Sequence, residues 1–210
     1  MCRLLYVRSD TEFEISKYLL KFSDISRNSK EYQGHGWGCS YLSGNKWKHY
    51  KNIKPVWEDN LQDFGYTNVL IAHVRSAFKD EGIIVENNMP FYDDKYVFVF
   101  NGELRGVRVK SEGRTGAEKI FNYIKRFDKG SIKEAIEKST SVILKMTEYV
   151  RAMNFILCNK NSVYVYSYFS EDPEYFTLHY KAGPELVICS MPFPEENAWH
   201  KVENRSLTKF

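Results

Sequence analysis

Two neighbouring stretches decide the fold class, AEKIFNYIKRF at residues 117–127 and IKEAIEKSTSVILKM at residues 132–146. Apolar residues recur in both at helical spacing, which predicts two consecutive helices. Strand-like segments rich in aromatic and β-branched residues lie on both sides of them. Helices gathered between two groups of strands favour an α+β fold with antiparallel sheets over a chain of alternating strands and helices.

The predicted strands fall into two groups. The first comprises residues 2–7, 36–42, 46–50, 69–75 and 96–100, and the second comprises residues 152–158, 162–168, 175–180 and 185–190. A further helix is predicted at residues 11–22, with Asp10 or Thr11 as its cap. Because no Gly/Ser-rich linker and no repeat of fixed period interrupts this order, we expect a single domain over residues 1–210.

The composition excludes several classes of protein. Of the 210 residues 43% are hydrophobic, 16% aromatic and 27% charged, which rules out disordered, collagen-like and coiled-coil chains. The formal net charge of +3 is too small for a dedicated nucleic-acid-binding protein. No apolar run approaches the about 20 residues of a membrane helix, and the N-terminus lacks the long apolar core of a signal peptide. We therefore expect a cytoplasmic protein that binds neither nucleic acid nor membrane.

The cysteines and histidines show no pattern of a metal site. The four cysteines (Cys2, Cys39, Cys158 and Cys189) have no CxxC spacing, and the five histidines add no zinc-type motif. We expect neither a metal nor another cofactor, and we expect the last three cysteines to be inert core thiols.

Cys2 differs from the other cysteines because it directly follows Met1. Removal of Met1 would leave a thiol and a free α-amine on one residue. That amine titrates near about pH 8, so it can accept the proton of the thiol. The alternative is that Cys2 is simply the first buried position of a strand.

Two further segments allow both a structural and a catalytic interpretation. Arg75 ends the apolar run Val69–Arg75, and its planar guanidinium is either a surface group at a strand end or the partner of a carboxylate. Asn101-Gly102 joins residues 95–100 to residues 103–109, which favours a hairpin turn. The alternative is an oxyanion hole built from the Asn101 amide and the Gly102 N–H group.

Glycines flank Trp37 in the run HGWGC at residues 35–39. They allow the backbone to approach either a ligand or a neighbouring strand, and the composition does not separate the two. The basic residues at 105–114 favour a solvated loop over an RNA-binding site, because no aromatic residues are interleaved with them.

The order of these features is more informative than any one of them. Cys2 begins a strand, and a Gly-Trp-Gly strand, Ala72-His73-Val74-Arg75, Met89-Pro90-Phe91, Asn101-Gly102, a helix start at Gly113-Arg114-Thr115 with Glu118, Met153-Asn154-Phe155, Ser190 and Trp199 follow in turn. This order resembles that of the class II glutamine amidotransferases, in particular the small stand-alone kind. The resemblance covers nearly the whole chain.

The resemblance implies an N-terminal-nucleophile hydrolase fold, with two stacked antiparallel sheets between helical layers (αββα). It also implies that Cys2 is the nucleophile and that its own α-amine is the general base. Asn101 and Gly102 would stabilise the oxyanion. The reaction would be hydrolysis of a γ-amide through a thioester on Cys2.

The resemblance also implies how the substrate is held. Arg75 would bind the α-carboxylate of glutamine or of another γ-glutamyl compound, and Trp37 and Gly116 would lie in the same substrate site. Ammonia would pass to a separate synthase partner, or the protein would be a plain γ-glutamyl hydrolase.

The chain departs from the family at positions that recognise the substrate. Gly116 stands where the family has an aspartate that pairs with the α-amine of the substrate. Met89 and Phe100 stand in place of histidines, and Phe78 stands in place of a small polar residue. These departures predict an altered substrate. They also leave an alternative function open, that of a catalytically inactive relative that binds a small ligand or a partner.

Overall fold

The computed structural model describes residues 1–77 and 81–210. Its helices are α1 (Ile15–Arg27), α2 (Gly116–Arg126), α3 (Ile132–Lys145) and α4 (Pro173–Phe176), with short 3₁₀ turns η1 (Val56–Glu58) and η3 (Val85–Asn87). Its strands are β1 (Arg3–Glu14), β2 (Trp37–Ser43), β3 (Lys46–Asn52), β4 (Tyr66–Val74), β5 (Phe91–Tyr92), β6 (Val97–Arg105), β7 (Tyr149–Cys158), β8 (Val163–Ser167), β9 (His179–Lys181), β10 (Glu185–Cys189), β11 (His200–Lys201) and β12 (Ser206–Lys209).

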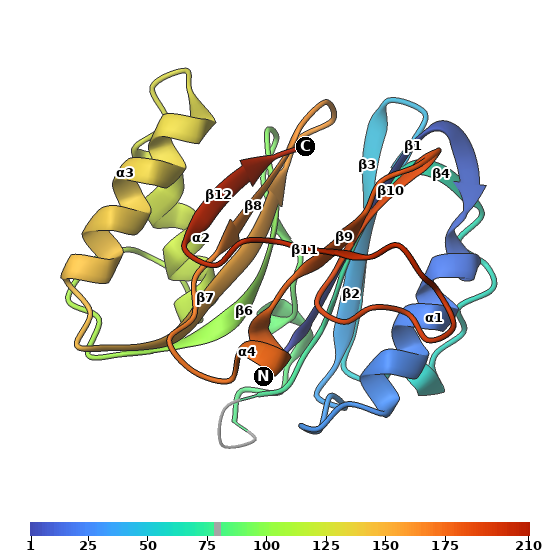
Figure 1. The fold of residues 1–210 in the computed structure, drawn as a ribbon, viewed down its shortest axis with the longest axis horizontal. Coiled ribbons are helices and arrows are strands. Elements are labelled where there is room, and N and C mark those ends of the chain that lie inside the picture. Colours follow the sequence, from blue (N-terminus) through green and yellow to red (C-terminus); the bar gives the residue numbers. More distant parts are fainter. Residues whose placement is uncertain (78–80) are drawn as a thin grey trace.

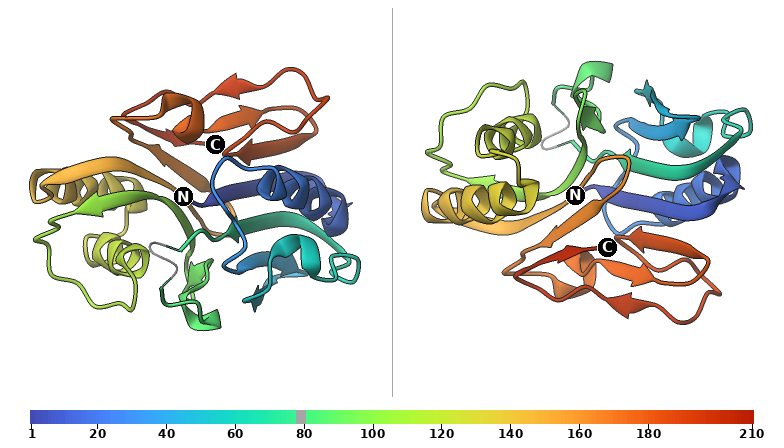
Figure 2. Two further views of the ribbon diagram at one scale, coloured as in Figure 1. Left: turned by 90° about the horizontal axis from the view of Figure 1, so that it is seen from below. Right: turned by 90° about the horizontal axis from the view of Figure 1, so that it is seen from above.

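The strands form two sheets that pack face to face between helices (Figure 1). The first sheet has the order β11-β9-β10-β1-β4-β2-β3, and the second has the order β12-β8-β7-β6-β5. Neighbouring strands run antiparallel, as in the pairs of β1 with β4 and of β6 with β7. Helix α1 covers the outer face of the first sheet, while α2 and α3 cover the outer face of the second (Figure 2). These layers confirm the predicted α+β class and its αββα arrangement.

Alternation along β1 separates the hydrophobic core into two parts. Leu5 and Val7 pack in the core with Phe22 of α1. Leu4 and Tyr6, at the alternate positions, belong to the core that contains the second sheet. Position 2 therefore shares the face of Leu4, which is turned toward the second sheet.

The boundary between β1 and α1 differs from the sequence prediction of a helix at residues 11–22. Strand β1 continues to Glu14 because Phe13 and Glu14 pair with Thr67 and Tyr66 of β4, beyond an irregularity that follows Arg8. Helix α1 then begins at Ile15. Pairing with a neighbouring strand outweighs the local helical pattern here.

Two other predicted elements are also wrong. Asn101-Gly102 is not a hairpin turn, because β6 runs straight through it and places Asn101 opposite Asn154 of β7. Residues 175–180 are not one strand, because Pro173 begins the short helix α4 and only His179–Lys181 form β9.

No helix in the described part of the chain is both long enough and apolar enough to span a membrane.

Candidate active site

Strand alternation brings Cys2 and Asn101 together from different sheets. On β6, Phe98 stacks on Phe121 of α2, with 5.1 Å between ring centroids, so its side chain faces the outer helices. Phe100 is on the same face. The next residue, Asn101, therefore points to the opposite face, toward the first sheet and the start of β1.

Cys2 is held by two contacts beside the end of β4. Its backbone nitrogen donates a hydrogen bond to Asn101 Oδ1 at 2.9 Å, and its Sγ lies 3.8 Å from the carbonyl oxygen of Ser76. Burial raises the pKa of the Cys2 thiol, while the nearby positive charges of the chain terminus and Arg75 oppose that rise. The thiol therefore needs a nearby base to become a nucleophile at neutral pH.

Asn101 is fully buried, and only one end of its amide is used. Its Oδ1 accepts from Cys2, whereas its Nδ2 has no hydrogen-bond partner within residues 1–77 and 81–210. Such buried donors are rare, because each one left open costs about 1–3 kcal/mol. The Nδ2 group is thus a donor held next to Cys2 and available to a ligand.

Gly102 lets the two central strands approach closely at this point. A Cβ atom built on Gly102 would lie 2.1 Å from the carbonyl oxygen of Ala152 on β7. Any side chain would push β7 away from β6 beside Asn101. Asn154, which lies opposite Asn101 on β7, supports the same region. Its Nδ2 donates to the Phe176 carbonyl at 2.6 Å, and its Oδ1 accepts from the Tyr168 nitrogen at 3.0 Å.

Arg75 lies within electrostatic range of Cys2, just beyond the end of β4. Its backbone is fixed by the segment before β2, since Arg75 N donates to Gly36 O at 2.9 Å and His35 N donates to Arg75 O at 3.1 Å. The guanidinium donates through Nη1 to Gly82 O at 2.8 Å and through Nη2 to Glu81 O at 3.3 Å. A guanidinium has five N–H donors, so these two bonds leave donors for a carboxylate.

Trp37 does not occupy the position expected for a substrate contact. Its side chain is fully buried in the core on the α1 side of the first sheet. The indole nitrogen donates to Asp59 Oδ2 at 2.9 Å, and the ring packs on Tyr50 and Phe64. Strand alternation explains the difference, because Trp37 faces the helix while its flanking glycines face the other way.

The glycines beside Trp37 serve the approach of another segment of the chain. A Cβ atom on Gly36 would lie 2.2 Å from Asn88 Nδ2, and one on Gly38 would lie 2.5 Å from Met89 O. Met89 and Phe100, which we expect to stand in place of histidines, are both buried in the hydrophobic core. Phe78, the other departure, lies outside the described residues.

Gly116 is the first residue of α2, and the space around it is open. Arg114 pairs with Glu118 there, with Nη2 to Oε1 at 2.9 Å. Burial and the charge of Arg114 together lower the pKa of Lys51 to about 8. Lys51 therefore also lies near the start of α2. Burial, together with the charges of Arg75 and Lys51, lowers the pKa of His73, so His73 lies within electrostatic range of both regions.

The residues around Met1 are functional candidates that the sequence reasoning missed. The Met1 ammonium pairs with Glu31, and the Met1 carbonyl oxygen accepts hydrogen bonds from Gln33 Nε2 and from Tyr175 OH. Glu31 and Gln33 come from an irregular segment between α1 and β2, and Tyr175 comes from α4. No motif or period marks such residues, so nothing in the sequence singles them out.

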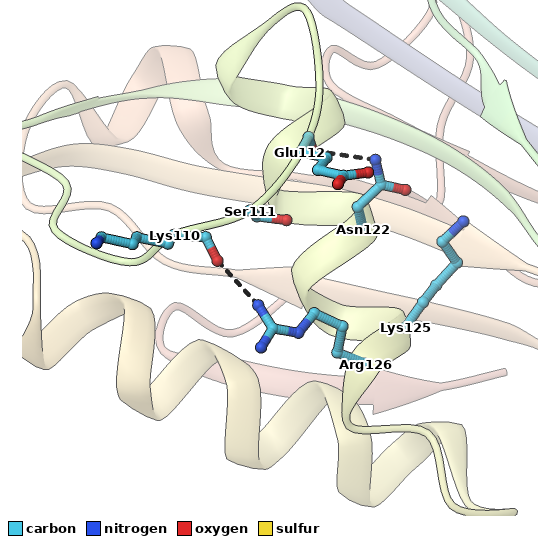
Figure 3. Close-up of a pocket in the computed structure, with 6 residues that line it drawn as sticks. All are labelled: Lys110, Ser111, Glu112, Asn122, Lys125 and Arg126. Atoms are coloured by element: carbon cyan, nitrogen blue, oxygen red, sulfur yellow. Dashed lines mark hydrogen bonds between the residues drawn. The ribbon is translucent and has the colours of Figure 1, made fainter.

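A separate hollow of about 770 Å³ lies between the loop before α2 and the outer side of that helix (Figure 3). Lys110, Ser111, Glu112, Asn122, Lys125 and Arg126 line it. Arg126 Nη1 donates to Lys110 O at 2.9 Å and Asn122 Nδ2 donates to Glu112 O at 3.1 Å, so the loop is tied to α2. None of these lining residues is a predicted site residue. Across the described ranges, no cluster of three or more His, Cys, Asp or Glu side chains is arranged to hold a metal.

Comparison with known proteins identifies the family. The family model for class II glutamine amidotransferases matches residues 1–180, so the chain belongs to that family. No curated protein gave a significant sequence match.

Solved structures agree with this assignment. The chain is similar to a glutamine aminotransferase class-II domain protein from Silicibacter pomeroyi, with 12% identity, a TM-score of 0.65 and coverage of 99% of this chain and 94% of that one. It is also similar to a predicted glutamine amidotransferase from Pseudomonas aeruginosa, with 12% identity, a TM-score of 0.64 and coverage of 100% and 97%.

A longer protein shares the fold as well. Glutamine phosphoribosylpyrophosphate amidotransferase from Bacillus subtilis is 17% identical with a TM-score of 0.62, and the match covers 90% of this chain but only 42% of that one. The expected N-terminal-nucleophile hydrolase fold is thereby confirmed.

We expect Cys2 to be the most reactive of the four thiols once Met1 is removed, because only Cys2 then has an amine beside it. Burial raises the pKa of the Cys39 and Cys158 thiols and raises that of Cys189 to about 12. Iodoacetamide labelling followed by peptide mapping should therefore find Cys2 modified well before the others. The same protein with Met1 retained is the control and should label slowly; labelling of Cys39 first would contradict the assignment.

Proposed function

We propose that the protein hydrolyses the γ-amide of a glutamine-like compound, with Cys2 as the nucleophile. The observation that carries this proposal is the amide of Asn101. Its Oδ1 fixes the Cys2 nitrogen at 2.9 Å, while its Nδ2 is buried and open beside it. A preorganised donor next to a nucleophile suits the oxyanion that forms when a carbonyl is attacked.

The chemistry follows from these positions. The Cys2 α-amine takes the proton of the thiol, and Sγ attacks the γ-carbonyl carbon. Asn101 Nδ2 and the Gly102 N–H group stabilise the oxyanion. The carbon–nitrogen bond then breaks, and the leaving nitrogen takes the proton from the α-amine. Water hydrolyses the γ-glutamyl thioester, which releases the acid and restores the thiol.

The general base requires the removal of Met1. While Met1 is attached, the Cys2 nitrogen is a peptide amide that donates to Asn101 and has no basic lone pair. We propose that Met1 is absent from the working enzyme. An N-terminal extension that stays attached would then abolish activity without changing the fold.

The charges around Gly116 disfavour free glutamine as the substrate. Arg75 offers donors for an α-carboxylate, but the expected carboxylate for the α-ammonium is missing at position 116. Glu118 is already paired with Arg114, and Lys51 adds a further positive charge to that group. An ammonium that leaves water without gaining a partner is costly, so we propose a γ-glutamyl amide whose amine end is modified or lies elsewhere.

If the leaving group is ammonia, we propose that a synthase partner in the cytoplasm receives it.

The test of the function is the loss of hydrolysis on substitution of the two central residues. Cys2→Ala should abolish release of glutamate from γ-glutamyl amides, because no covalent intermediate forms. Asn101→Ala should lower kcat by about 10²–10³, the effect of removing one oxyanion donor. Cys158→Ala, a buried thiol in the second sheet, is the matched control and should keep activity.

A second outcome would identify the alternative function. If the unmodified protein with Cys2 as its first residue hydrolyses no γ-glutamyl amide, the catalytic proposal is wrong. The binding of such compounds to Cys2→Ala, measured by calorimetry, would then identify an inactive ligand-binding relative.

Restoring an acid at position 116 should improve the use of free glutamine. Gly116→Asp meets no atom within 4 Å of its Cβ and places a carboxylate at a helix N-terminus, where negative charge is favourable. We expect kcat/KM for L-glutamine to rise about tenfold, as one charge-assisted contact is restored. Gly116→Asn is the uncharged control and should give little change. Equal values for both variants, or efficient glutamine hydrolysis by the unmodified protein, would show that position 116 does not recognise the amine.

A further inference from the structure

Met1 occupies a seat that contacts every part of the residue. Its ammonium pairs with Glu31, its carbonyl oxygen accepts from both Gln33 Nε2 and Tyr175 OH, and its side chain packs on an apolar floor. We call this the Met1 seat; it comprises Glu31, Gln33, Ala152, Phe169, Tyr175 and Phe176.

Residues of the Met1 seat also contact one another without Met1. Gln33 is fully buried, and its Nε2, which has two hydrogens to donate, also lies 3.0 Å from Glu31 O and 3.2 Å from Tyr175 OH. The apolar floor is buried as well: Phe176 is 1% exposed and Phe169 9% exposed. Removal of Met1 would therefore leave a shaped recess with two donors that converge on one point.

This recess adjoins the α-nitrogen of Cys2, which gives its proton to the leaving nitrogen in the proposed reaction. The α-nitrogen of Cys2 keeps its bond to Cα and its contact with Asn101, and the direction now taken by the Met1 carbonyl carbon becomes free. The leaving nitrogen of a substrate must come within hydrogen-bond distance of this amine, about 3 Å, to receive its proton. That distance falls within the volume that the Met1 main chain fills now.

We propose that, after Met1 is removed, the Met1 seat binds the leaving amine of the substrate, and that this amine is an apolar α-amino acid. The substrate would then be a γ-glutamyl dipeptide with an apolar second residue. This inference rests on the proposed hydrolysis by Cys2 and names the part of the substrate that Arg75 does not hold.

Each part of such an amino acid has a counterpart in the seat. Its carboxylate takes the two donors of Gln33 and Tyr175, and the guanidinium of Arg3, 4.4 Å from the centre of the Tyr175 ring, supplies a positive charge beside them. Its side chain covers the apolar floor. Glu31 faces the nitrogen as this becomes an ammonium, just as it pairs with the Met1 ammonium now.

The experiment compares three substrates on protein whose first residue is Cys2. These are L-glutamine, γ-glutamylglycine and γ-glutamyl-L-methionine. We expect kcat/KM for the methionine dipeptide to exceed that for the glycine dipeptide about tenfold or more, the factor expected when a side chain of this size leaves water. Phe169→Ala should reduce this ratio severalfold, because it removes part of the floor.

A conservative variant tests the donors separately. Tyr175→Phe keeps the ring but removes the hydroxyl, so kcat/KM for both dipeptides should fall about tenfold relative to that for L-glutamine. Tyr32→Phe is the matched control, since Tyr32 is exposed and lies outside the seat. In that control, neither the kcat/KM ratio of the methionine dipeptide to the glycine dipeptide nor that of the dipeptides to L-glutamine should change.

The outcomes separate this inference from the proposed function. Hydrolysis of all three substrates with equal kcat/KM for the two dipeptides, or ratios that Phe169→Ala and Tyr175→Phe leave unchanged, would overturn the Met1 seat as a leaving-group site. Failure to hydrolyse any of the three would overturn the proposed function, and the leaving-group assignment with it.

Discussion

The hydrogen bond from the Cys2 nitrogen to Asn101 Oδ1 joins the residue just before β1 of one sheet to the middle of a strand in the other. It exists only because β1 and β6 lie in stacked sheets and both turn the relevant residue toward their common interface. Once it is formed, the opposite end of the same amide lies beside the thiol with no partner in the described structure. One buried side chain therefore fixes Cys2 and presents the donor that the proposed reaction needs. The close approach of β7 at Gly102 and the bonds of Asn154 hold that side chain in place.

Much of the fold was predictable because its signals are local. The helices α2 and α3 follow from apolar spacing, and the stacked sheets follow from the order of helices and strands. The errors occurred where a contact distant in sequence outweighs the local pattern. Residues 11–14 extend β1 because Phe13 and Glu14 pair with Thr67 and Tyr66. Asn101-Gly102 continues β6 because β7 lies alongside. Those partners lie too far away in the sequence for a local pattern to include them.

The candidate site shows the same division. The order of motifs brought Cys2, Arg75, Asn101 and Gly102 to notice, and the structure places Cys2 beside Asn101 and within electrostatic range of Arg75. The substrate contact expected for Trp37 was not found. No sequence feature tells which face of a strand a glycine-flanked aromatic residue takes. The residues around Met1 left no signal, since Glu31, Gln33 and Tyr175 meet only after the chain has folded.

The most direct test of this account is a crystal structure of the protein, with Cys2 as its first residue, after reaction with an electrophilic ketone analogue of glutamine. The account predicts a covalent bond to Cys2 Sγ, with the oxygen of the former ketone within about 3 Å of both Asn101 Nδ2 and the Gly102 nitrogen. The Cys2 α-amine should still donate its hydrogen bond to Asn101 Oδ1. An adduct on Cys39, Cys158 or Cys189, or an oxygen that contacts neither donor, would contradict the account.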